Sequence, residues 1–484
     1  MTLIERLFGL KDATPEGIRL ARIMAIMLPA FAASFQISTT FWMIQIAESL
    51  GDGDYNKGLT MVGFLVILQL AIQTVLDYPT GALGDHIGQR FVIASALLCY
   101  AVAFWLTSLV TVDTPFFVFA LIYGLMGFGA SQESGAFNAW FDNNYRVAMP
   151  EDTDRKQYGV FMGKVGMIFQ AMSTLVLLPG SWLALLYNRE FVFRIQAVLC
   201  VILALVVLRI IRDLPGVRDS DEDEKSISEY IGLMKEGVGF LRADQFVMLT
   251  ILGEVLIWAT GTVWWTLLLF PLYFSYLLSD VAVSAFRTLV FIPEAGVQER
   301  SGIWSKRFDP VKWIPRFRFL QFCGFIFYII LSITTFLFPP VPTDTVLVGI
   351  NIPFTTIPLI EMPASSIIPV GILFVVFVVT DMFGGFAQIL TQRVMIDVIP
   401  SRIRNSMYSL KPTLAIILAI PLLGLFGFIQ PLFGFGVTFG LISIVSLIGA
   451  ILIRQGFKHP IPKIEAVVPA SSEEQEEVAE LDIT

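Results

Sequence analysis

The chain has 484 residues, of which 56% are hydrophobic and 15% are charged. A soluble domain carries roughly 25% charged residues, so this composition, with a mean hydropathy of +0.75, excludes a soluble protein and predicts a polytopic membrane protein. The net charge of −8 comes from acids gathered in residues 213–224 and 459–484. Both stretches are hydrophilic, so the charge indicates nothing about a solute, and no nucleic-acid partner is expected.

Apolar segments of membrane-spanning length follow one another along the whole chain. A bilayer core about 30 Å thick requires roughly 20 apolar residues per helix. Twelve segments reach or approach this length and predict an all-α protein with twelve transmembrane helices. In chain order they are 20–46, 59–80, 91–110, 115–140, 158–186, 191–208, 246–272, 281–298, 313–337, 367–394, 412–428 and 433–453.

The positions of lysine and arginine predict the orientation, because cytoplasmic loops collect these residues. If the N-terminus is cytoplasmic, all 32 of them fall in cytoplasmic segments except Lys57, Arg189, Arg194 and Arg287. We therefore expect a multi-pass protein of the cell membrane, surrounded by the lipid bilayer, with both termini in the cytoplasm.

The two halves of the sequence repeat. A shift of 250 residues lays 135–158 over 385–408, with Gly135 on Gly385 and Pro150 on Pro400. This predicts two six-helix bundles, 1–212 and 246–458, as in transporters built from repeats. The linker 213–245 is acidic and includes an amphipathic helical pattern, and the tail 459–484 is acidic and expected to be disordered.

No metal site, cofactor or enzymatic activity is expected. The chain has two histidines and three cysteines, and Cys99, Cys200 and Cys323 lie far apart inside predicted helices. The sequence contains no HExxH, CxxC or P-loop pattern, and no catalytic constellation is present.

The connection between the second and third predicted helices reads DYPTGALGDHIGQR (77–90). Its glycines permit sharp turns and close helix approach, and an aspartate there can accept hydrogen bonds from helix N-terminal amides or a guanidinium. Gly81, Leu83, Asp85, Gly88 and Arg90 match the pattern G-x-L-a-D-r-x-G-r-k. Through this motif the chain resembles the major facilitator superfamily.

Three further stretches resemble one bacterial and archaeal branch of that superfamily. DYPTG resembles its E-x-P-T-G sequence, with Asp77 in place of the glutamate. Residues 134–143 resemble its fourth-helix motif, except that Asn138 stands at the glutamate position. Residues 399–409 resemble its entry into the eleventh helix.

The resemblance implies two pseudo-twofold-related bundles that rock around a central cavity. It implies that helices 1, 2, 4, 5, 7, 8, 10 and 11 line the cavity while 3, 6, 9 and 12 pack outside. We expect a cytoplasmic gate in which Asp85 contacts the start of helix 11 near residues 406–411. The residues assigned to this gate are Asp77, Gly81, Asp85, Gly88, Arg90, Arg155 and Arg404.

Ionisable residues inside transmembrane helices cost at least about 2.5–3.5 kcal/mol each by insertion scales, so each requires a reason. We identify six candidates for a substrate or proton site: Glu133, Lys164, Glu254, Arg287, Glu294 and Asp381. Asp381 lies roughly 21 Å into its helix at 1.5 Å per residue, near the membrane midplane, where transporter sites lie. Arg287 is a cationic partner for it, and a structural ion pair is the alternative, above all for Glu133 with Lys164.

The sequence therefore predicts a monomeric secondary active transporter that moves a small organic solute and is coupled to protons. The direction of transport is left open, and export is one alternative. The fifth-helix G-x-x-x-G-P signature of drug/proton antiporters is absent, because Pro179 follows Gly166 only after a dozen residues. The alternative is a non-transporting membrane sensor or anchor that retains the transporter fold.

Overall fold

The computed structural model describes residues 3–10, 13–152, 156–215, 217, 235–236, 238–340, 347–351, 354–356, 358–399 and 401–462. Most of the predicted amphipathic linker helix and all but the first residues of the acidic tail lie outside this set. Arg155 also lies outside it, and the side chains of Asp85 and Arg404 are not described.

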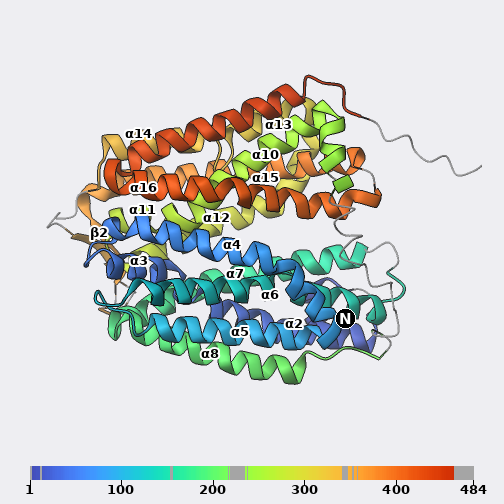
Figure 1. Cartoon of the computed structure of the whole chain (residues 1–484), viewed down its shortest axis with the longest axis horizontal. Helices are drawn as coiled ribbons and strands as arrows, with labels where there is room; N and C mark the ends of the chain where they lie inside the picture. Colours follow the sequence, from blue (N-terminus) through green and yellow to red (C-terminus); the bar gives the residue numbers. More distant parts are fainter. Residues whose placement is uncertain are drawn as a thin grey trace, which may run out of the picture.

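Helices of the first half form one bundle, drawn in blue and green in Figure 1. They are α1 (Leu3–Phe8), α2 (Pro15–Gln36), α3 (Thr39–Leu50), α4 (Tyr55–Ile87), α5 (Gln89–Thr107), α6 (Phe116–Ala148), α7 (Lys156–Leu186) and α8 (Arg189–Ile210).

The second half forms a second bundle alongside the first (Figure 1). Its helices are α10 (Gln245–Val263), a π-helix (Trp264–Leu268), α11 (Leu269–Leu277), α12 (Asp280–Trp304), α13 (Pro310–Leu320), α14 (Phe325–Leu337), α15 (Ile367–Val398) and α16 (Ser401–Gly456). Short 3-10 turns (Ser305–Arg307 and Ala364–Ser366) follow α12 and precede α15.

Among the described residues, ten stretches are long and apolar enough to cross a membrane. One of them lies within α16, where Gly434 has a φ of 75° and separates two helices. A further crossing is α12, a helix of 25 residues that carries Arg287 and Glu294. The described chain thus contains the twelve crossings that the sequence predicts.

A two-stranded antiparallel sheet follows α14, between the ninth and tenth predicted segments. Its strands are β1 (Leu347–Asn351) and β2 (Pro358–Pro363), with Val348 opposite Met362. We call the end of the bundle that carries this sheet the hairpin end. The N-terminus and the end of α16 lie at the opposite end, the terminal end (Figure 1).

Two predicted segments are interrupted rather than continuous. Segment 20–46 divides into α2 and α3, and segment 313–337 divides into α13 and α14. In the second break the Phe322 amide donates to the carbonyl of Thr380 at 2.9 Å. Gly324 directly precedes α14, and glycine fits this position because a Cβ there would lie only 2.7 Å from the Gln321 carbonyl oxygen. The break brings Phe322 toward α15.

The two bundles are packed together toward the hairpin end. A large buried cluster there joins Val62 and Leu65 of α4 to Leu423 and Phe426 of α16. The Thr60 hydroxyl donates to the carbonyl of Gly427 at 2.9 Å. Gly63 of α4 faces Gly427 of α16 there, since a Cβ at Gly63 would lie 3.5 Å from the Gly427 Cα. Small residues let helices approach this closely, so the hairpin end is a sealed interface between the halves.

Candidate functional site: a charged cavity between the two bundles

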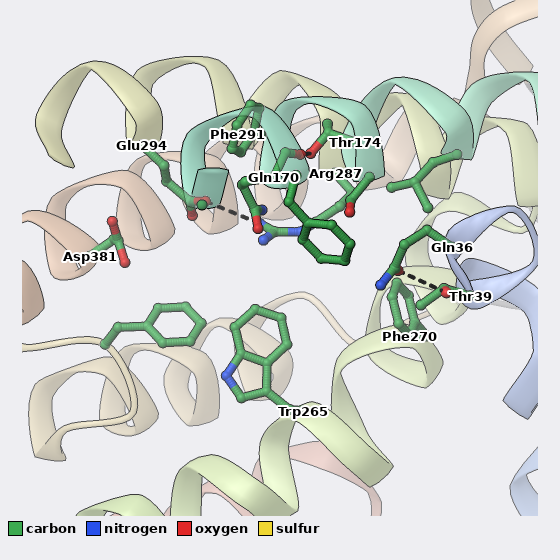
Figure 2. A pocket seen from close by; sticks show the side chains of 15 residues that line it. Gln36, Thr39, Gln170, Thr174, Trp265, Phe270, Arg287, Phe291, Glu294 and Asp381 are labelled. Carbon is green, nitrogen blue, oxygen red and sulfur yellow. Dashed lines mark hydrogen bonds and ion pairs between the residues drawn. The ribbon is translucent and has the colours of Figure 1, made fainter. Parts of the chain in front are cut away.

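A cavity of about 630 Å³ lies between the bundles. Pockets of about 300–1,000 Å³ are typical of small-molecule sites. The first half contributes α2, α3 and α7, and the second half contributes the π-helix, α11, α12 and α15. The lining residues labelled in Figure 2 are Gln36, Thr39, Gln170, Thr174, Trp265, Phe270, Arg287, Phe291, Glu294 and Asp381.

Three of the six predicted charges meet in this cavity. Arg287 Nη1 lies 3.3 Å from Glu294 Oε2, and the two side chains are only 15% and 11% exposed. The Arg287 guanidinium also lies 5.5 Å from the ring centroid of Trp265. Asp381 on α15 lines the same cavity, at the Glu294 side (Figure 2). Two carboxyl groups therefore share the field of one guanidinium.

The π-helix at residues 264–268 positions the aromatic wall. A π-turn adds one residue to a helical turn, and such turns are frequent at functional sites. Trp264 is fully buried in the core of the second bundle, whereas Trp265 is 46% exposed and lines the cavity. The turn thus places one tryptophan in the core and the next beside Arg287.

The rest of the lining combines amides, hydroxyls and aromatic rings. The Thr39 hydroxyl lies 2.9 Å from Gln36 Oε1, just after the break between α2 and α3. Gln170 is exposed toward the cavity, and Phe270 and Phe291 provide apolar surfaces. A few polar groups among aromatic walls are suited to an organic solute of mixed polarity.

Phe322 also lines the cavity, although it belongs to the ninth predicted segment. The family resemblance implied that this segment packs outside the cavity. The break between α13 and α14 explains the difference, because its non-helical residues extend toward α15. The sequence signal for this break was the QFCG stretch before α14.

Glu254 lies in a separate ionic cluster within the second bundle. It is 2% exposed and forms ion pairs with both Arg318 of α13 and Lys411 of α16. Arg318 also donates to the hydroxyl of Thr391 at 3.0 Å. The sequence analysis counted Arg318 among the residues of a cytoplasmic segment. In the structure Arg318 lies on α13, which begins at Pro310, and is buried between the helices at 3% exposure.

Glu133 and Lys164 do not form the expected pair with each other, and neither lines the cavity. The reason is the packing of their helices. Glu133 lies on α6, which packs mainly against α4 and α5, whereas Lys164 lies on α7, which packs against α2 and α12.

The predicted gate motif is mostly helical instead of forming an open connection. Helix α4 continues through Gly81 and Asp85 to Ile87, and α5 begins at Gln89. Gly88 makes the turn with a φ of 99°, which favours glycine. The Arg90 guanidinium lies 4.6 Å from the ring centroid of Phe91, and Asp77 is exposed. The proposed contact of Asp85 with helix 11 stays a prediction.

An ionic contact that the sequence analysis missed joins the halves at the hairpin end. Arg189 at the start of α8 forms a bidentate pair with Asp280 at the start of α12, at 2.7 and 2.9 Å. It also lies 2.6 Å from Glu48 of α3. Next to this contact, the hydroxyls of Thr40 and Ser284 are 2.9 Å apart across the interface. The sequence signal for this contact was Arg189 itself, one of the four basic residues outside the predicted cytoplasmic segments.

We predict that Arg189→Ala opens the hairpin end. Removing one partner of a fully buried ion pair costs about 3–5 kcal/mol. The Arg189 and Asp280 side chains are partly buried, at 16% and 15% exposure, so the loss is smaller than this range, but it falls on a contact between the halves. Spin labels at Asp113 and Glu361, exposed on the two halves, should move apart in a much larger fraction of molecules. Arg194→Ala is the control, since Arg194 is exposed on the same helix. Identical distance distributions for the two variants would show that the contact does not hold this end closed.

Comparisons with known proteins agree on one family. The sequence model of the Major Facilitator Superfamily matches residues 23–367, which is more than half of the chain. No curated protein matches the sequence.

Solved transporter structures share the fold. A variant of the nucleoside transporter NupG superposes with a TM-score of 0.63 at 12% identity, covering 90% of this chain and 100% of that one. The D-xylose–proton symporter gives 0.58 at 13% identity, with 91% and 98% covered. A bacterial homologue of the human lysosomal transporter Spinster, inward-facing and occupied, gives 0.54 at 13%, with 90% and 92% covered. With two bundles around a shared cavity and a family match over most of its length, the chain belongs to the major facilitator superfamily.

Proposed function

We propose that the chain is a proton-coupled secondary active transporter that moves a small organic solute across the cell membrane by alternating access. The observation that carries this proposal is the cavity between the two bundles, with Arg287, Glu294 and Asp381 in its wall. Substrate and coupling-ion sites of such transporters lie at the interface of the repeats. Intramembrane charges gathered at that interface mark an ion or substrate pathway.

Proton coupling is supported by the balance of charges in the cavity. Arg287 can neutralise one of its two acidic neighbours, Glu294 and Asp381, but not both. Glu294 already holds the guanidinium at 3.3 Å, which leaves Asp381 as the carboxyl group that can gain and lose a proton as the cavity changes its access to water. A cationic solute could replace that proton, and the two could then exchange.

The solute is proposed to combine an apolar or aromatic part with hydrogen-bonding groups. Trp265, Phe270 and Phe291 provide surfaces for the first part, and Gln36 and Gln170 provide polar anchors for the second. The structural neighbours are named for a nucleoside and a monosaccharide, both of them small organic solutes, which supports this class without selecting one member.

The sealed hairpin end supports an inward-facing conformation for the structure described above. With both termini in the cytoplasm, as the basic residues predict, the hairpin end faces outward. The contact of Arg189 with Asp280 then closes the outer side, so the cavity would exchange solute with the cytoplasm. Export would begin from this state with solute entering from the cytoplasm.

A transport screen tests the proposal. The purified chain is reconstituted into liposomes and offered nucleosides, monosaccharides and hydrophobic amines, with and without an imposed pH gradient. We expect at least one class to accumulate only when the gradient is present, and the polarity of the effective gradient reports the direction. A chain that binds a solute but moves none under either gradient would favour a sensor or anchor instead.

A further inference from the structure

A second cavity, of about 810 Å³, opens between α13 and the last turns of α16, in the second bundle and apart from the central cavity. These two helices run side by side near the terminal end (Figure 1). We call this cavity the α13–α16 groove. Four of its lining residues are cationic: Lys312, Arg316, Arg454 and Lys458.

The four cations line the groove where α13 begins and α16 ends. Lys312 and Arg316 are four residues apart on α13 and share one helix face. Arg454 lies in the last turn of α16, and Lys458 follows just after the helix ends at Gly456. All four are exposed. No carboxylate lines the groove, and none of the four forms an ion pair with a residue that the structure describes. The four cations are therefore an uncompensated positive site.

The other end of the groove is apolar. Phe319 and Leu320 follow Arg316 toward the membrane interior on α13, and Leu447 and Ile451 precede Arg454 on α16. Both helices belong to membrane-spanning stretches. The groove thus presents a cationic region at the membrane surface that continues into an apolar wall beside it.

We propose that the α13–α16 groove binds an anionic phospholipid, with the phosphate at the four cations and an acyl chain along the apolar wall. Basic pockets between transmembrane helices bind the head groups of acidic lipids. Charge complementarity selects the anionic head group, and the apolar continuation selects a lipid over a soluble phosphate.

The acidic tail of the same chain, which begins just after α16, is the competing occupant. Its glutamates could reach the four cations, but a peptide could not enter the apolar part of the groove without leaving backbone groups unpaired beside lipid. The groove as a whole, with its two kinds of surface, therefore fits the phospholipid better.

Native mass spectrometry of the detergent-purified full chain tests this proposal. The chain is titrated with dioleoylphosphatidylglycerol or with dioleoylphosphatidylcholine. We expect the first lipid to bind at least tenfold more tightly. Since basic side chains near an anionic lipid surface strengthen its binding, Arg316→Gln with Arg454→Gln should weaken that binding at least tenfold. Arg209→Gln with Arg212→Gln removes two exposed cations at the end of α8 and should leave it within twofold.

Four results would overturn the proposal. Equal binding of the two lipids by the unaltered chain would exclude charge selection, whatever the variants do. Unchanged binding by the Arg316 and Arg454 variant would place the lipid elsewhere. Displacement of the lipid by an equal concentration of glycerol phosphate would identify a soluble anion as the ligand. Lipid binding that occurs only after residues 463–484 are deleted would identify the tail as the occupant.

Discussion

Asp381→Asn is expected to abolish gradient-driven accumulation, by at least tenfold, while solute exchange persists. The amide keeps the size of the side chain and mimics its protonated state, so the solute can still bind and both access states can still form. The cycle between protonated and ionised forms is lost, and with it the coupling to the proton gradient. Uptake under a pH gradient and counterflow at equal pH, measured on the same proteoliposomes, separate these two activities.

A conservative variant keeps this prediction specific. Asp381→Glu retains a carboxyl group in the cavity and should retain part of the accumulation, even if its affinity changes. Undiminished pH-driven uptake by Asp381→Asn would remove Asp381 from the mechanism. Glu294, the other carboxyl group beside Arg287, would then be the next candidate for the coupling proton.

Glu254→Gln is expected to destabilise the second bundle without acting on the central cavity. The carboxylate is 2% exposed and stands between Arg318 and Lys411, so its removal leaves a buried guanidinium without a counter-charge. Breaking a buried ion pair in this way costs about 3–5 kcal/mol. We expect the midpoint of thermal unfolding in detergent to fall by at least about 5 °C.

Lys411→Gln is the matched control inside the same cluster. The Lys411 side chain is 22% exposed whereas that of Arg318 is 3% exposed, and removal of the lysine leaves Glu254 paired with Arg318. Its effect on the unfolding midpoint should therefore be much smaller. If Glu254→Gln keeps the wild-type midpoint but loses transport, then Glu254 acts in transport and the cluster is not merely structural.

The intramembrane charges show how much of the candidate site can be predicted from the sequence. Arg287, Glu294 and Asp381 could be selected because a charge inside a membrane helix needs a reason, and the structure brings these three into one cavity. The same argument selected Glu254, whose partners lie in α13 and α16. No local pattern distinguishes a charge that lines a cavity from one buried among helices, because that depends on how distant helices pack.

Breaks within the helices are a second feature that the sequence does not predict. Apolar composition predicts the crossings, but it continues through residues 37–38 and 321–324, where the chain leaves the helix. The backbone there finds partners in neighbouring helices, as when Phe322 donates to Thr380. These tertiary contacts override local propensity, and they bring Phe322 to the cavity wall.

Chemical blocking of the cavity tests the central claim most directly. Gln170 is exposed on α7 and points into the cavity (Figure 2), so Gln170→Cys provides a thiol on the proposed solute path. Counterflow of the solute found in the screen is measured before and after a bulky methanethiosulfonate reagent, with the unaltered chain and its native cysteines as the control. Transport through the central cavity predicts that labelling stops counterflow in the variant alone and that solute slows the labelling. Full counterflow by the labelled variant would contradict it.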